Sequence, residues 1–139
     1  MSRRVWVPAT VALLATWSAA REVPAGQGHA VTTALREQWP EAGDEEWEYA
    51  VLLTAVEEAA TLLDAPGRRV VVVIETDTVR ELEGTGVAFP DPVPWRRVAA
   101  VHADPGDARV PPGASVEDEA DLGWYAVQEV PDLLDGGSG

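Results

Sequence analysis

Residues 70–74 read VVVVI, an unbroken run of β-branched side chains that follows two arginines and leads into the polar segment ETD. β-branched residues favour extended backbone, and a short run without polar residues is typical of a strand with both faces covered. The sequence therefore predicts a central strand here, and the rest of the fold has to be arranged around it.

The length of the chain, 139 residues, suits a single domain, and we assign residues 1–135 to it. A domain of this size buries roughly 68% of the surface of its unfolded chain, which is enough for a core without disulfides or structural metal. The sequence contains no cysteine, and this excludes disulfides, thiolate metal sites and cysteine nucleophiles.

The first twenty residues, MSRRVWVPATVALLATWSAA, allow two interpretations. Basic residues, an apolar stretch and small residues at 18–20 are typical of a secretory signal peptide, in which case the protein is secreted. Alternatively, residues 4–7 form a strand that Pro8 ends, and Thr10 caps a helix whose apolar residues recur at three- and four-residue spacing. We favour the folded interpretation, which predicts a cytoplasmic protein, because polar residues and Pro8 interrupt the apolar stretch. The stretch is also too short and too interrupted to span a bilayer, which takes about 20 apolar residues.

A long amphipathic helix is the clearest further element. Asp44 is a suitable N-cap, acidic residues follow in the first turn, apolar residues recur at helical spacing, and Pro66-Gly67 ends the helix. Weaker patterns predict strands at 29–32, 87–89, 97–102 and 123–127, helical turns at 33–40, 79–82 and 130–134, a mobile acidic loop rich in Pro and Gly at 103–121 and a flexible tail at 136–139. Helices come early and strands late, so the sequence predicts an α+β fold with helices packed on one face of a mixed, mostly antiparallel sheet.

The charge of the chain restricts its partners. The formal net charge is −14, from 24 acidic residues against 10 basic residues, all of them arginine. A field of this sign repels phosphate backbones and anionic lipid headgroups, so we expect neither generic nucleic-acid binding nor membrane binding. A partner protein with a basic surface stays possible, and so does an acidic mimic of nucleic acid, which would need its acids in rows at phosphate-like spacing.

Four polar residues at the ends of two predicted strands are the candidate metal site. Glu75 and Asp77 follow the run at 70–74, while His102 and Asp104 lie at the end of the strand at 97–102. If the two strands are parallel neighbours, one imidazole and three carboxylates meet at one sheet edge, and this ligand set suits Mg²⁺ or Mn²⁺. If the strands are antiparallel, the two pairs lie at opposite ends and no site forms. We predict no cofactor, with Mg²⁺ or Mn²⁺ as the alternative, and assign no catalytic residue.

The segment WYAVQEVPDLL near the end of the chain is the candidate partner-binding site. Aromatic residues dominate interface hot spots, so Trp124, Tyr125, Gln128 and Glu129 are candidate contacts. The alternative is that Trp124 and Tyr125 point to opposite faces of a strand and close the hydrophobic core. His29 follows Gly28 in a predicted loop and is expected to be an exposed side chain.

Several phrases of the chain are familiar when they are taken together: RVWVPAT, AVTTALREQWP, DEEWEYAVLL, RRVVVVIE, VAAVHADP and WYAVQEVPDLL. They resemble a conserved uncharacterised protein family of high-GC Gram-positive bacteria, a domain of unknown function. The resemblance covers nearly the whole chain, is weakest at 77–95, and implies that the N-terminal segment belongs to the domain. It implies no activity, cofactor or catalytic residue.

From the residues we expect a small, acidic protein-interaction module that is not an enzyme and that binds a protein partner or forms a homodimer through a sheet edge. A divalent-metal-binding protein or enzyme that uses the four strand-end residues is the alternative.

Overall fold

A seven-stranded antiparallel sheet forms the centre of the protein, in the order β5-β6-β3-β1-β4-β8-β9. The computed structural model describes residues 2–116 and 122–135. The strands of the large sheet are β1 (Arg3–Ala9), β3 (Gly26–His29), β4 (Val70–Thr76), β5 (Arg80–Glu81), β6 (Gly86–Phe89), β8 (Val98–Ala103) and β9 (Gly123–Tyr125). Two more strands, β2 (Glu22–Val23) and β7 (Val93–Pro94), pair with each other in a small second sheet. The α+β class is therefore confirmed, and each strand pair in the described part of the chain is antiparallel.

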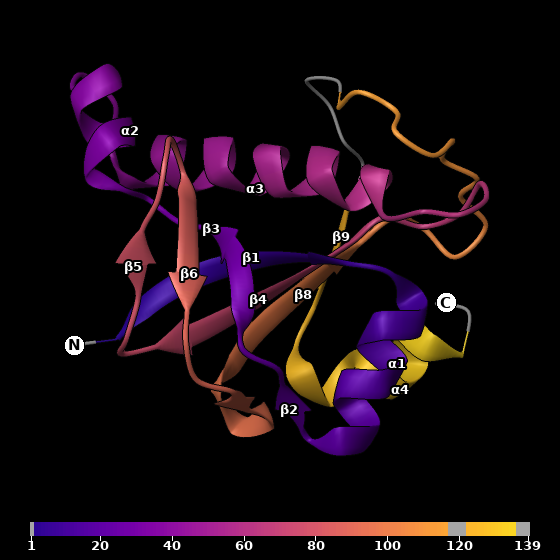
Figure 1. Ribbon diagram of the computed structural model, residues 1–139. Helices are drawn as coiled ribbons and strands as arrows, with labels where there is room; N and C mark the ends of the chain where they lie inside the picture. Colours follow the sequence, from indigo (N-terminus) through magenta and orange to yellow (C-terminus); the bar gives the residue numbers. More distant parts are fainter. Residues whose placement is uncertain (1, 117–121, 136–139) are drawn as a thin grey trace.

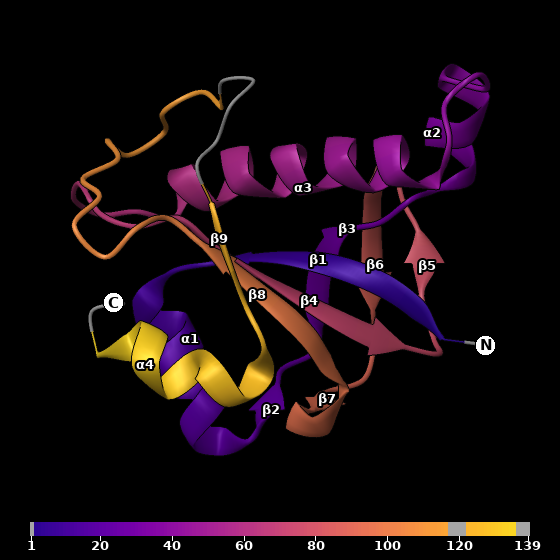
Figure 2. The same cartoon turned by 180° about the vertical axis from the view of Figure 1, so that it is seen from behind.

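Helices cover both faces of the sheet. They are α1 (Val11–Ala20), α2 (Thr33–Gln38), α3 (Asp44–Thr61) and α4 (Val130–Leu134), with the short 3-10 helices η1 (Trp95–Arg97) and η2 (Val127–Glu129). Figures 1 and 2 show α3 along one side of the sheet, with α1 and α4 together on the other side. The prediction that helices pack on one face is wrong.

The valine run of β4 explains why two layers are needed. Val71 and Val73 pack into the apolar cluster beneath α3, whereas Val70, Val72 and Ile74 pack into the cluster that includes α1 and α4. Successive side chains of a strand point to opposite faces, so a run of five apolar residues leaves both faces of the sheet to be covered.

The N-terminal segment supplies the neighbour of β4 in the middle of the sheet. Strand β1 pairs with β4 from Arg3 to Ala9, and Trp6 and Trp17 are only 5% and 9% exposed. The folded interpretation of residues 3–20 is confirmed, including Thr10 as the N-cap of α1. Pro8 lies within β1 instead of ending it. It is tolerated because β1 pairs with β3 only at Trp6, so the strand has no second neighbour around Pro8 that needs a backbone donor.

Several weaker predictions differ from the structure at their boundaries. The N-cap of α3 is Gly43 rather than Asp44, and the helix ends at Thr61, before Pro66-Gly67. The segment after α1, where the sequence predicts a loop around Gly28, contains β2 and β3, and the predicted turn at 79–82 contains strand β5. Short paired strands of two to four residues carry too little periodicity to be recognised without their partners.

The predicted loop at 103–121 begins inside the fold. Ala103 is the last residue of β8, and Asp104 is buried. Gly67 and Val110 exchange two backbone hydrogen bonds, with N–O distances of 3.0 and 2.8 Å. Residues 117–121 of this loop and the tail at 136–139 lie outside the described residues, and the mobility of both stays a prediction.

Candidate functional site

The four strand-end residues do not form a metal site. Strands β4 and β8 are antiparallel, and Val71 lies opposite His102, so Glu75 and His102 are at opposite ends of the pair. The prediction of one shared ligand set is therefore wrong. Across residues 2–116 and 122–135, no group of three or more His, Asp or Glu side chains is arranged to hold a metal ion.

Two of these acids form ion pairs with arginines instead. Asp77 accepts hydrogen bonds from Arg97 at 3.2 and 3.3 Å on the surface, and these bonds lower the pKa of the Asp77 carboxyl. Asp104 accepts three hydrogen bonds from Arg69, from the backbone N at 2.7 Å and from Nε and Nη2 at 2.8 Å each. The two ion pairs lie at opposite ends of the β4–β8 strand pair.

The predicted partner-binding residues are divided between the faces of the sheet. Trp124 of β9 lies opposite His102 on the α3 side of the sheet, whereas Tyr125 packs against the cluster on the other side. Gln128 is exposed, and the Glu129 carboxylate accepts a hydrogen bond from the Ala126 backbone N at 2.9 Å. Of this set, Trp124 is the residue that lines a groove.

This groove lies between α3 and strands β8 and β9, and we call it the α3–β9 groove. It has a volume of about 430 Å³. The sheet contributes Arg4, Trp6, Val73, Ala99, Ala100, His102 and Trp124 to its lining, and α3 contributes Glu45, Glu48, Tyr49 and Leu52. An apolar floor with charged groups at the margin is the usual chemistry of a binding groove.

Two aromatic side chains in the groove are unusually exposed. Trp124 is 61% exposed and Tyr49 is 49% exposed, the two highest values among the large hydrophobic residues of the described chain. They come from segments 75 positions apart in sequence, so only the tertiary fold brings them to one site. Sequence reasoning missed Tyr49. Tyr49 could have been recognised from its position on α3, next to the buried face of the helix that contains Val51 and Ala55.

An apolar hollow continues the surface over the N-terminal half of α3. It has a volume of about 470 Å³ and shares Glu45 and Tyr49 with the α3–β9 groove. Trp39 and Leu53 add to its lining. Tyr49 therefore stands between two hollows that together extend the apolar surface from β9 across α3.

The two histidines have different roles. His29 is in β3 rather than in a loop, and its ring nitrogens hydrogen-bond Thr85 Oγ1 at 2.9 Å and Glu58 Oε1 at 2.8 Å. Its ring thus connects β3 to α3 and to the turn before β6. His102 lines the α3–β9 groove, where burial lowers the pKa of its imidazole.

The lowered pKa of His102 predicts a pH dependence of stability. Protons bind more weakly to the folded protein than to the unfolded chain, so the free energy of unfolding decreases as the pH falls from about 6.5 towards the folded pKa. His102→Gln is expected to remove this decrease. Urea unfolding of both proteins across this range measures the decrease, because the comparison cancels every contribution that the two proteins share. An unchanged pH slope in the variant would contradict the prediction.

Comparison with known proteins gives one match. The model of a family of unknown function, DUF6912, matches residues 3–134. No curated protein and no solved structure matches the chain. None of the described helices is both long and apolar enough to cross a membrane. The predicted origin in high-GC Gram-positive bacteria stays a prediction.

Proposed function

The chain belongs to this family of unknown function, and we propose that it is a protein-interaction module rather than an enzyme. Its α3–β9 groove binds a segment of another protein that carries an apolar anchor residue flanked by lysine or arginine. The observation that carries the proposal is the exposure of Trp124 and Tyr49 in one groove.

Exposed aromatic residues in a concave site offer apolar surface that a bound segment can cover. Aromatic side chains bury a large apolar area on binding and dominate interface hot spots. Trp124 and Tyr49 have the apolar groups of Leu52 and Ala100 around them. An aliphatic or aromatic anchor from a partner can therefore fill the groove and cover both rings.

Charge supports a basic partner over a second copy of this chain. Each copy has a net charge of −14, so two copies repel each other until salt screens the repulsion. The margin of the groove along α3 carries Glu45 and Glu48, next to Asp44 and Glu46 in the same first two turns, and these acids outnumber Arg4 on the side of the sheet. A segment with positive residues on either side of its anchor complements this margin.

The geometry of β9 supports side-chain anchoring more than strand addition. β9 is an edge strand of three residues, Gly123–Tyr125, and the other edge strand, β5, has two. Short edge strands offer few backbone groups to an added strand and protect a sheet from pairing with its own copies. The proposed homodimer through a sheet edge is thus the less favoured mode of association.

Selection from a random peptide library displayed on phage tests the proposal with a defined probe. Selected peptides are expected to share one apolar anchor flanked by Lys or Arg. Their affinity should fall at least about tenfold with Trp124→Ala or Tyr49→Ala, because truncating a hot-spot aromatic costs about 2 kcal/mol or more. Raising the salt concentration should also weaken binding.

Leu82→Ala is the matched control, because Leu82 is an exposed large hydrophobic side chain outside the groove. It is expected to leave peptide affinity unchanged. Peptides that bind Trp124→Ala as tightly as the natural protein, or a selected set rich in Asp and Glu, would contradict the proposal. So would self-association at low salt that displaces the peptides.

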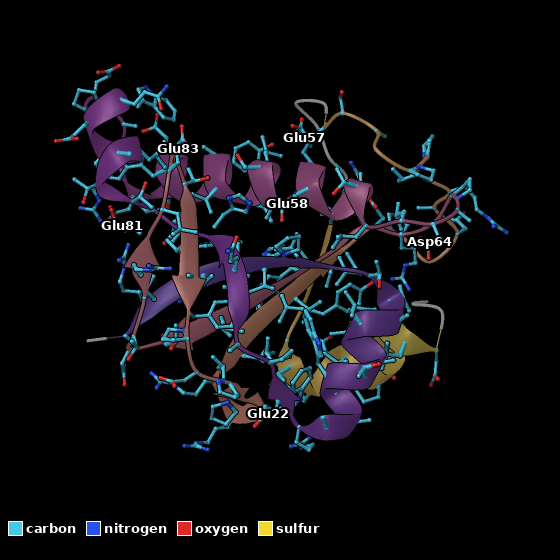
Figure 3. All side chains as sticks on the ribbon, in the orientation of Figure 1. Glu22, Glu57, Glu58, Asp64, Glu81 and Glu83 are labelled. Atoms are coloured by element: carbon cyan, nitrogen blue, oxygen red, sulfur yellow. The ribbon has the colours of Figure 1, made fainter. Side chains whose placement is uncertain are left out.

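The acidic side chains are less suited to imitating nucleic acid. Figure 3 shows Glu22, Glu57, Glu58, Asp64, Glu81 and Glu83 spread around the molecule rather than aligned in one row. A mimic of a phosphate backbone needs regular rows, so this view favours a basic protein segment as the partner. We place the module in the cytoplasm. The support is that residues 3–9 form the central strand, which the sheet requires.

A further inference from the structure

A further cavity, which shares no residue with the α3–β9 groove, is lined in part by a buried arginine that has no counter-ion among residues 2–116 and 122–135. Arg68 is 8% exposed, and its Nε and Nη1 donate hydrogen bonds to the backbone oxygens of Asp104 and Leu133, each at 3.0 Å. Its remaining nitrogen, Nη2, is buried and has no hydrogen-bond partner in the part of the chain that the structure describes. The nearby carboxylate of Asp104 is bound to Arg69.

A buried guanidinium group with unmade hydrogen bonds is unstable relative to one that binds an anion. Its charge has lost water, and two backbone carbonyls do not neutralise it. Arg68 lines a cavity of about 590 Å³, so its positive charge lies beside a site with room for a small molecule, while Nη2 itself is covered by the protein.

Two further features make the cavity attractive to anions. Arg109 contributes a second guanidinium group to its lining. Val11, the first residue of α1, also lines the cavity, and the first turn of α1 contains no acidic residue. The Thr10 side chain caps only the Leu13 N–H, so the N–H groups of Val11 and Ala12 have no intrahelical acceptor at the positive end of the helix dipole.

We infer that the cavity beside Arg68 binds a small phosphate monoester with an apolar body. Two guanidinium groups and a helix N-terminus together suit a phosphate dianion, and Asp107 in the lining offsets only part of this positive charge. Val11, Leu63 and Pro66 provide the apolar part of the wall. Binding is expected to place a negative charge beside the buried Arg68 guanidinium group.

Calorimetric titration with phenyl phosphate, inorganic phosphate and benzoate, at an ionic strength matched with sodium chloride, tests the inference. Phenyl phosphate should bind most tightly, because it uses both the cationic and the apolar parts of the wall. Each ligand that binds should raise the melting temperature, and at equal concentration the tighter ligand should raise it more. The inference is overturned if phenyl phosphate gives no heat of binding and no rise in melting temperature beyond that in sodium chloride. It is also overturned if benzoate binds more tightly than phenyl phosphate, because the site would then prefer carboxylates to phosphates.

Substitutions at exposed positions test phosphate binding without disturbing the fold. Arg109→Gln should weaken phenyl phosphate binding about tenfold. Ala12→Glu places a carboxylate in the first turn of α1 and should abolish phosphate binding without lowering the melting temperature. Arg96→Gln removes the same charge at an exposed position outside the cavity, and should leave binding unchanged. Equal weakening by Arg109→Gln and Arg96→Gln would show a general charge effect and overturn the site.

Discussion

Asp104→Ala is expected to lower the free energy of unfolding by about 3–5 kcal/mol, because it removes one partner of a buried ion pair. The Asp104 side chain is buried, and three hydrogen bonds of 2.7–2.8 Å connect it to the backbone and guanidinium group of Arg69. These bonds also raise the pKa of Arg69 above its usual range. The variant leaves Arg69 charged and mostly buried with no acceptor.

The position of Asp104 adds to this effect. Asp104 directly follows β8, and its ion-pair partner Arg69 directly precedes β4. The ion pair therefore connects the adjacent ends of two central strands. Chemical unfolding should show the loss, and the melting temperature should fall by roughly 10–20 °C for a domain of this size. The double variant Asp104→Leu with Arg69→Met should recover part of the loss, because it leaves no unpaired charge in the interior.

Asp77→Ala is the matched control for this prediction. Asp77 also accepts two hydrogen bonds from an arginine, Arg97, but that pair is exposed to solvent. Exposed ion pairs contribute little to stability because water and salt screen them. Equal effects of the two alanine substitutions would contradict the claim that burial sets the size of the loss.

Gly28→Ala is expected to destabilise the protein by about 1–3 kcal/mol, the usual range for overpacking a core. A Cβ at residue 28 would lie 2.8 Å from the backbone oxygen of Trp6 and 2.8 Å from a methyl carbon of Val5. Both contacts are with the central strand β1, which cannot shift without disturbing its pairing with β4. The melting temperature and the midpoint of urea unfolding measure the loss.

Gly26→Ala provides the control on the same strand. Residue 26 is two positions away and faces the same side of β3, but the nearest atom to an added Cβ there is 3.9 Å away. Alanine also restricts the unfolded chain more than glycine does, so this variant should be neutral or slightly stabilising. A larger loss at residue 26 than at residue 28 would show that close packing against β1 is not the reason for the glycine.

Local sequence patterns are sufficient to predict the helices and strands that have a clear apolar periodicity or a distinctive composition. The valine run of β4, the long helix α3 and the capped helix α1 were all recognised from neighbouring residues. The strands β2, β3 and β5 were missed or misplaced, because each has four residues or fewer and is extended only through its pairing. Trp124 was singled out, while Tyr49, its neighbour in the groove, was not.

The sequence by itself determined that β4 is a buried strand, that residues 3–20 can form a strand and a helix, and that the whole chain is strongly acidic. These properties follow from side-chain branching, apolar spacing and charge, which act over a few residues or on the chain as a whole. Only the tertiary structure decided that β4 and β8 are antiparallel, which separates the four predicted metal ligands. It also placed Tyr49 with Trp124 in one groove and buried Arg68 without a carboxylate partner among the described residues. The direction and order of strands depend on contacts between distant segments, and no local pattern encodes which segments will meet.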